Sequence, residues 1–411
     1  MKTANIESGY AWLRLAAALG LSMVGGLGMY IGVVAMPAFQ ADFGVNRGDA
    51  SMPFTMVMFG FGVGGIIIGR IVDRYGIVRP LAVSIVALGA SYLLAARAEA
   101  YWMFTAIHAL IGCFGCGSVF APLVADISKW FSRRRGLAVA ICACGGYLAG
   151  ALWPPIVYAM IADAGWRETY TFIGIASMGA MLPLLVMLRR QPVGDTHFVE
   201  GGGSAGSPRS LGLSPTVLLT LLSLAGFGCC TAMAMPQVHL VSICGDRGYG
   251  VARGAEMLSL MLGCGIVSRL AFGWISDSLG GLRTILLGST LQCVALAMFL
   301  PANSLASLYI VSAVFGLFQG GIVPCYALII REYFPPVEAG SRLGVVILAS
   351  VLGMAFGGWV SGVIFDWTGS YGAAFLNGIG WNLANISIVV FLLSRARLAP
   401  VGSSVVVPAA Y

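Results

Sequence analysis

Twelve runs of mostly apolar residues, each about 20 residues long, follow one another along this chain of 411 residues. A helix of about 20 residues spans the ~30 Å hydrocarbon core of a bilayer at 1.5 Å per residue. Only 9% of the residues are charged, against about 25% in soluble proteins. The predicted spans are 12–35, 51–72, 79–97, 102–124, 137–161, 168–188, 215–242, 253–275, 284–302, 306–330, 341–365 and 371–394. The sequence therefore predicts an all-α membrane protein with twelve transmembrane helices.

A single long polar gap, from Arg189 to Ser214, divides the twelve runs six and six. It contains the low-complexity run GGGSAGSPRS, which is typical of a flexible tether. We therefore expect an N-terminal six-helix bundle over 1–194, a cytoplasmic linker over 195–214 and a C-terminal six-helix bundle over 215–411.

The two halves of the chain share a repeated loop. Residues 69–79, GRIVDRYGIVR, are matched 204 residues later by residues 273–283, GWISDSLGGLR, which place Gly, Asp, Gly and Arg at the same spacing. Internal repeats of this kind are typical of carriers whose halves rock about a site at their interface. The repeat predicts two pseudo-symmetric bundles and an alternating-access mechanism.

The basic residues gather in alternate loops and so predict an orientation. With the N-terminus inside, seventeen of the 23 Lys and Arg residues lie on the cytoplasmic side and five lie outside. Because Lys and Arg are retained in cytoplasmic loops, both termini are expected in the cytoplasm. The net charge of +7 thus reports topology and gives no support to nucleic-acid binding.

Residues 69–79 resemble the G-x-x-x-D-R-x-G-x-x-R signature of the major facilitator superfamily. Residues 7–12, ESGYAW, and residues 130–145, WFSRRRGLAVAICACG, resemble motifs of the monocarboxylate transporter family, including its bacterial and oxalate/formate-exchanging relatives. The resemblance implies the major facilitator fold in a bacterial inner membrane. It also implies transport of a small hydroxy, oxo or aromatic monocarboxylate by alternating access, linked to protons. The particular acid, the direction of transport and the coupling ion stay open.

Charged residues in the repeated loops are candidates for a conformational lock. Those of the first loop can form charge-assisted hydrogen bonds that hold the halves together at the cytoplasmic face when the carrier is open outward. Asp126, near the inner end of the fourth span, is expected to pair with nearby arginines in the same lock. An alternative is that these residues only anchor the topology. The predicted lock residues are Asp73, Arg74, Arg79, Asp126, Asp277 and Arg283.

Arg269 lies inside the eighth predicted span, eight residues and so about 12 Å before Asp277. A guanidinium at this depth costs ~3 kcal/mol unless it faces an aqueous cavity or an anion. The Asp and Glu residues group near span ends, whereas a substrate carboxylate would suit the planar fork of arginine. The position 204 residues earlier is Gly65, so a scaffold role shared by both halves is disfavoured. In the resembled family an arginine here binds the substrate carboxylate; the alternative is an arginine reaching the inner surface.

The chain departs from the proton-coupled animal members of that family at two positions. Gly265 stands where they carry an aspartate, and Tyr30 stands where they carry a lysine. His239 follows Pro236, where a helix broken by proline could line the cavity; a hydrogen-bonded packing histidine is the alternative. The candidate substrate-binding residues are Arg269, His239, Tyr30, Phe120, Tyr147 and Gln319.

The sequence disfavours catalysis, because three scattered histidines and no membrane-embedded acidic pair give no cluster of nucleophile, base or metal ligands. We expect no cofactor and no metal. The expected partners are a carboxylate substrate, protons and the lipid bilayer, and the chain is expected to be monomeric. The remaining alternative is an exporter of drugs or other amphiphilic small molecules, for which Arg269 would be dispensable.

Overall fold

The structure is a computed structural model that describes residues 7–190 and 211–398, so residues 195–210 of the predicted linker lie outside the described residues. Each regular element in the described part of the chain is a helix. The first half contains α1 (Gly9–Gly25), α2 (Gly28–Phe43), α3 (Arg47–Ala50), α4 (Met52–Tyr75), α5 (Val78–Ala96), α6 (Tyr101–Gly112), the π-helical turn η1 (Cys113–Gly117), α7 (Ser118–Ser128), α8 (Arg135–Ala143), α9 (Gly145–Ala164) and α10 (Trp166–Val186). The second contains α11 (Pro215–Asp246), α12 (Val251–Leu279), α13 (Gly281–Phe299), α14 (Leu305–Gln319), α15 (Ile322–Tyr333), α16 (Pro336–Thr368) and α17 (Tyr371–Leu398).

These helices make twelve segments that are long and apolar enough to cross a membrane within the described residues. Several spans combine two helices, as α1 and α2 do over Gly9–Phe43. Large apolar side chains on the outer surface stay exposed, among them Val83 at 68%, Phe172 at 61% and Ile310 at 60%. Such surfaces suit acyl chains and would be unfavourable in water. The predicted all-α architecture with twelve spans is confirmed.

The 204-residue repeat extends from the loops into the packing. A Cβ added at Gly112 would lie 2.0 Å from the carbonyl oxygen of Val57, and one added at Gly316 would lie 2.0 Å from that of Met261. Both members of the second pair are 204 residues after those of the first. Only glycine permits two helices to approach this closely. The same backbone crossing therefore occurs in both halves, which supports their origin as a structural repeat.

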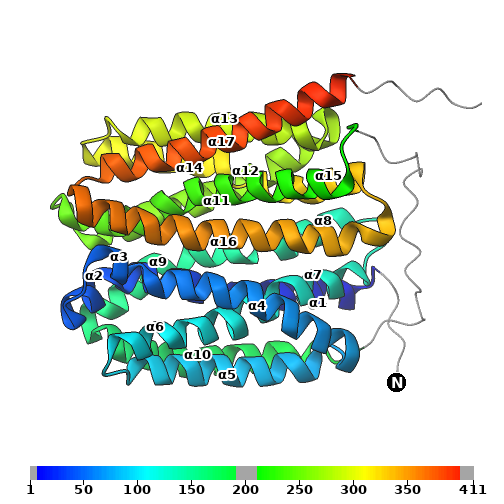
Figure 1. Cartoon of the computed structure of the whole chain (residues 1–411). Helices are drawn as coiled ribbons and strands as arrows, with labels where there is room; N and C mark the ends of the chain where they lie inside the picture. The colour runs from blue at the N-terminus through cyan, green and yellow to red at the C-terminus, as the bar shows by residue number, and fades with distance from the viewer. Residues whose placement is uncertain (1–6, 191–210, 399–411) are drawn as a thin grey trace, which may run out of the picture.

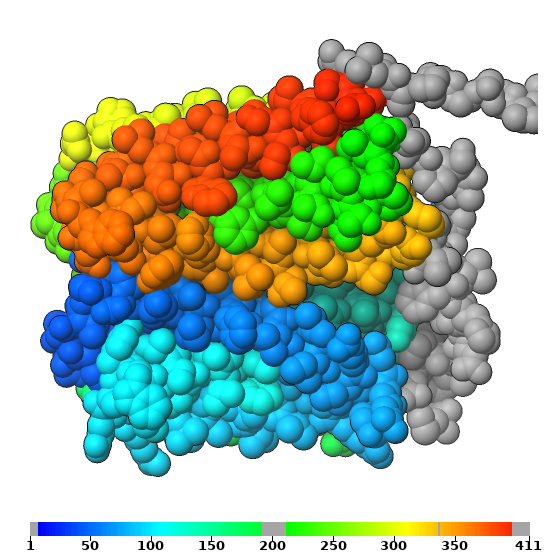
Figure 2. All heavy atoms as spheres, in the orientation of Figure 1, coloured from blue at the N-terminus to red at the C-terminus, as the bar shows by residue number. Residues whose placement is uncertain are grey.

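The helices run between two ends of the molecule (Figure 1). We call the end where α2 turns into α3 the Arg47 end, and the end where α4 turns into α5 the Asp73 end. Figure 2 shows the first half, in blue and cyan, meeting the second half, in green to red, along α4 and α16. The other main contact between the halves joins α9 and α12. These four helices therefore form most of the direct contact between the halves.

Candidate functional site

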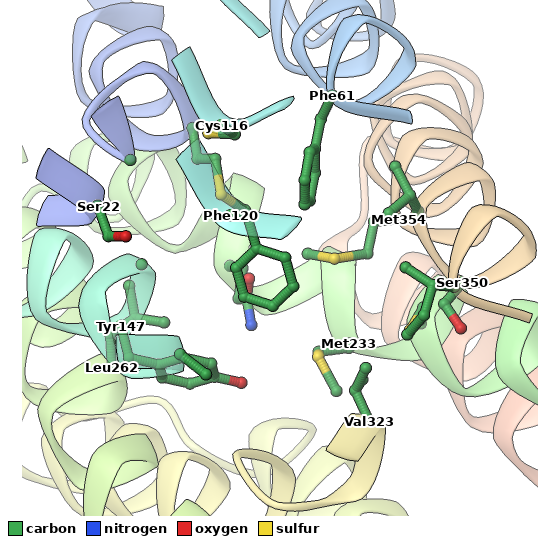
Figure 3. A pocket seen from close by; sticks show the side chains of 18 of the residues that line it. Ser22, Phe61, Cys116, Phe120, Tyr147, Met233, Leu262, Val323, Ser350 and Met354 are labelled. Carbon is green, nitrogen blue, oxygen red and sulfur yellow. The ribbon is translucent and has the colours of Figure 1, made fainter. Parts of the chain in front are cut away.

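A cavity of about 150 Å³ lies between the two halves and is lined by residues of both. At about 30 Å³ per water, this volume holds roughly five water molecules, or a small organic molecule in their place. Its wall is mainly apolar, with thioether groups from Met29, Met233 and Met354 and rings from Phe61 and Phe120. Figure 3 shows side chains from both halves around the open space. The cavity suits a ligand with an apolar body.

Arg269, on α12, is the one cationic side chain among the described residues that line the cavity. Its Nη1 donates to the Ala143 carbonyl at 2.7 Å and its Nε donates to the Gly320 carbonyl at 3.3 Å. Both carbonyls lie at helix interruptions, where backbone acceptors lack a helical donor. Arg269 forms no ion pair with a carboxylate of the described residues. Backbone carbonyls and an aromatic ring, and no carboxylate of the described residues, therefore surround its charge.

The guanidinium of Arg269 touches both halves. Its carbon lies 4.4 Å from the centroid of the Tyr147 ring on α9, so the cation rests over an aromatic face of the first half. Ala143 belongs to the same half, whereas Gly320 belongs to the second. An anion held by Arg269 would consequently lie at the interface, where its binding can influence how the halves sit together.

Gly265 makes room for Tyr147 beside Arg269. A Cβ at Gly265 would lie 2.5 Å from Cε1 of Tyr147, too close for any side chain unless the ring moves. Gly265 also lies one helical turn before Arg269, so an acidic side chain here could pair with the guanidinium. The glycine therefore keeps the ring in place and the cation unpaired.

We expect Gly265→Asp to weaken binding of a carboxylate ligand by tenfold or more, on the order of one charge-assisted hydrogen bond, because the new carboxylate displaces Tyr147 and competes for Arg269. Isothermal titration of the purified variant with benzoate measures the effect. Gly263→Ala is the matched control, since a Cβ there meets only Ala151 at an ordinary 3.8 Å. Equal affinity for the Gly265→Asp variant and the parent would contradict this role of Gly265.

The structure brings four of the six candidate binding residues to this cavity. Tyr30 on α2, Phe120 on α7 and Tyr147 on α9 line it together with Arg269. Gln319 is fully buried just behind the wall and accepts a hydrogen bond from Gln237 of α11 at 3.0 Å. Gln237 itself lines the cavity and was not among the candidates.

His239 lies outside the cavity lining. Its Nε2 is 2.8 Å from the carbonyl oxygen of Gly358, so the imidazole bridges α11 and α16. The expectation that Pro236 breaks the helix is wrong, because α11 continues from Pro215 to Asp246 with this proline inside it. An unbroken helix keeps His239 turned toward α16 and away from the central space. The geometry is that of a hydrogen-bonded packing histidine.

The predicted lock residues of the two repeated loops are exposed. Within the described residues their side chains form no ion pair, and their role stays a prediction. Asp126 is different, because it binds Arg14 bidentately at 2.7 and 2.8 Å. Arg14 is only 1% exposed and also donates to the carbonyls of Leu188 and Arg190, each at 2.9 Å. The partner of Asp126 is thus in α1 of its own half, and this pair does not join the halves.

An ionic cluster joins the halves at the Arg47 end. Arg47 of α3 is 7% exposed, and its Nη2 donates to both carboxylate oxygens of Asp246 at 3.0 and 2.8 Å. Tyr371 donates to the same carboxylate at 2.5 Å. Asp366 of α16 accepts from the backbone N–H groups of Arg47 at 2.9 Å and Gly48 at 2.6 Å. We call Arg47, Asp246, Asp366 and Tyr371 the Arg47 latch, which closes this end of the interface.

The two motif stretches, 7–12 and 130–145, meet in space at the Asp73 end. The Tyr10 and Trp130 rings lie 5.3 Å apart, and the Trp12 and Phe131 rings lie 5.0 Å apart. Glu7 accepts backbone N–H bonds from residues 132, 133 and 134 at 3.2, 2.6 and 2.8 Å. The motifs therefore form one structural unit that ties the start of α1 to the loop between α7 and α8.

Hydrogen bonds to the Glu7 carboxylate, that from the backbone of Arg134 first, hold the pKa of Glu7 below its ordinary value. A lowered pKa means that this cap contributes at pH values above the ordinary glutamate range and is lost as pH falls through the lowered pKa. We expect Glu7→Ala to speed amide hydrogen exchange of residues 132–134 at pH 7. Glu338→Ala, which removes an exposed carboxylate paired with Arg342, is the control. Unchanged exchange in the Glu7→Ala variant would show that the cap does not order the loop.

The sequence is similar to a known protein family and to individual transporters. The sequence matches the family model of the Major Facilitator Superfamily over residues 18–305 and 255–406. An uncharacterized MFS-type transporter, YcxA, of Bacillus subtilis is 27% identical over 343 residues, which cover 81% of this chain and 82% of that protein. Monocarboxylate transporter 13 of Rattus norvegicus is 26% identical over an alignment that covers 95% of this chain and 91% of that protein.

A solved structure shares the fold. The crystal structure of a bacterial homolog to the human lysosomal transporter Spinster, in an inward-facing and occupied conformation, superposes with a TM-score of 0.67. The alignment covers 96% of this chain and 97% of that chain at 15% sequence identity. At this identity the likeness concerns the arrangement of the helices.

Proposed function

This chain belongs to the major facilitator superfamily, and on that premise we propose that it is a secondary carrier of a small monocarboxylate across the inner membrane of a bacterium. The observation that carries the proposal is Arg269, an intramembrane cation that faces the cavity and has no carboxylate partner among the described residues. A guanidinium at this depth is costly unless an anion or water compensates its charge. A substrate carboxylate supplies that charge and matches the fork of two N–H donors.

The rest of the cavity favours an acid with an apolar body. Aromatic rings and thioether groups surround the space, and flexible thioethers adapt to differently shaped ligands. The similarity to monocarboxylate transporter 13 over 95% of the chain agrees with an acid substrate. One cation in the cavity wall matches one carboxylate, so a monoanion is favoured over a dianion.

The position of the cavity between two repeated halves supports an alternating-access mechanism. The Arg47 latch closes one end of the interface in this conformation. Orientation by the basic loops assigns the Arg47 end to the outside and the Asp73 end, with both termini, to the cytoplasm. The conformation is then closed to the outside. Opening outward requires the latch to separate.

A monoanionic substrate carries a negative charge, and this charge favours transport together with a proton. Moving a monoanion inward against a negative interior costs about 2.3 kcal/mol per 100 mV. A proton carried with the anion cancels this cost and lets the pH gradient drive uptake. The linkage therefore predicts that an inward proton gradient accelerates uptake of an acid.

Uptake of labelled pyruvate, lactate and benzoate into proteoliposomes tests the function. We expect saturable uptake that an inward proton gradient stimulates and that Arg269→Ala abolishes. Arg253→Ala, at an exposed pair with Glu256, controls for the loss of any arginine. Equal uptake by the parent and Arg269→Ala would contradict carboxylate binding at Arg269. Transport of neutral amphiphiles independent of Arg269 would favour the exporter alternative, which the apolar wall also accommodates.

A further inference from the structure

A pair of carboxamides lies beside the cavity with most of its hydrogen-bond donors unused. The Nε2 of Gln237 donates to the Oε1 of Gln319 at 3.0 Å. The Nε2 of Gln319 is buried and has no hydrogen-bond partner among the described residues. Each carboxamide carries two N–H donors. The pair is therefore rich in donors, and it needs an acceptor that the described protein groups do not supply.

The carboxamide pair and Arg269 both contact the break between α14 and α15. Gln319 is the last residue of α14, and Gly320, the next residue, accepts the hydrogen bond from Nε of Arg269. Adjacent Cα atoms are about 3.8 Å apart, so the two polar groups approach the same short stretch of backbone. Gln237 on α11 and Arg269 on α12 both line the cavity, so the two polar groups border the same space.

A purely structural role does not account for this arrangement. A bridge between α11 and α14 uses one hydrogen bond and leaves Nε2 of Gln319 without a partner, which costs free energy for a buried amide. Gln292, in the same half, is a buried glutamine whose carboxamide nitrogen and oxygen both have hydrogen-bond partners. Its Nε2 donates to the Cys229 carbonyl at 3.3 Å and its Oε1 is 3.4 Å from the Cys229 Sγ. Unlike Gln237, it does not line the cavity.

We propose that Gln237 and Gln319 form a second polar subsite, which binds a hydroxyl or oxo oxygen of the transported acid while Arg269 binds its carboxylate. This inference rests on the proposed function and narrows it to oxygen-bearing monocarboxylates. The ligand oxygen accepts an N–H bond from Gln237, the member of the pair that lines the cavity, while Gln319 behind the wall holds the Gln237 carboxamide in place. A site built to bond such an oxygen rejects the analogue that lacks it, because its buried donors are then left unpaired.

The test measures dissociation constants of matched acids by isothermal titration. The pairs are phenylpyruvate with 3-phenylpropanoate, 2-oxobutanoate with butanoate, and 3-(4-hydroxyphenyl)propanoate with 3-phenylpropanoate. The parent is expected to bind the oxygenated member of at least one pair tenfold or more tightly, on the order of one hydrogen bond. Gln237→Leu and Gln319→Leu should each reduce this preference to less than about threefold while the deoxygenated acid still binds. Binding of the deoxygenated acid also shows that each variant is folded.

Two further variants distinguish failure of the carboxamide subsite from failure of carboxylate binding. Gln292→Leu should leave the preference unchanged, whereas Arg269→Gln should weaken both members of a pair together. A parent that binds both members of every pair equally, or a preference that survives in both glutamine variants, would overturn the subsite and leave carboxylate binding intact. Failure of the parent to bind any of these acids would overturn both proposals.

Discussion

Arg269→Gln is expected to weaken binding of a monocarboxylate by about 100-fold or more. Glutamine keeps a donor of similar reach but removes the charge and the fork of two N–H bonds. Hydrogen bonds to charged groups contribute about 1.5–3 kcal/mol each, so losing a bidentate pair amounts to a factor of 10² to 10⁴. Isothermal titration with benzoate at low ionic strength measures the loss.

Arg269→Lys separates charge from geometry. Lysine restores the charge as a compact ammonium without the planar fork, so we expect an affinity between those of the parent and Arg269→Gln. Lysine also cannot reproduce both bonds that Arg269 makes to the carbonyls of Ala143 and Gly320. Full affinity in Arg269→Lys would show that only net charge matters, and full affinity in Arg269→Gln would contradict the site.

Arg47→Ala is expected to shift the carrier toward conformations in which the Arg47 end is open. Removal of this side chain leaves the Asp246 carboxylate without its partner from the other half. Asp246 is 39% exposed, so water replaces part of the interaction and we expect a loss of about 1–2 kcal/mol. That corresponds to roughly a 5- to 30-fold change in the conformational equilibrium. Hydrogen-exchange mass spectrometry should show faster exchange in α3 and in the adjoining end of α16.

The latch offers its own controls. Asp366→Ala removes the carboxylate that accepts the backbone N–H bonds of Arg47 and Gly48, so it should increase exchange in the same segments. Arg167→Ala breaks an exposed pair with Asp42 at the same end but within one half, and should leave α3 protected. Protection of α3 in both latch variants equal to that of the parent would mean that apolar packing alone keeps this end closed.

The sequence predicted the spans and the repeat because both depend on local or periodic properties. Runs of apolar residues must be helical in lipid, since each backbone polar group needs a partner inside the segment. The depth of Arg269 could likewise be counted from Asp277. Its position in the cavity wall agrees with that count, although its carbonyl partners, Ala143 and Gly320, depend on where the helices break.

The remaining site features depend on pairs far apart in the chain. Arg47 and Asp246 are 199 residues apart, and each lies at a span end, where a charge is equally consistent with a simple topology signal. Arg14 lies near the start of α1, where a basic residue is equally typical of a cytoplasmic span end, but Asp126 and two backbone carbonyls bind it inside the first half. Nothing in the sequence indicated that Gln237 lines the cavity, because a glutamine beside a proline does not reveal which face of an unbroken helix it occupies.

The most direct test of the central claim, that the cavity binds a carboxylate at Arg269, compares an acid with its neutral amide. Benzoate and benzamide have nearly the same shape, so their dissociation constants from the parent protein report the contribution of the charge. We expect benzoate to bind about 100-fold more tightly than benzamide, and Arg269→Gln to remove this difference. Equal binding of the two ligands by the parent would contradict the central claim.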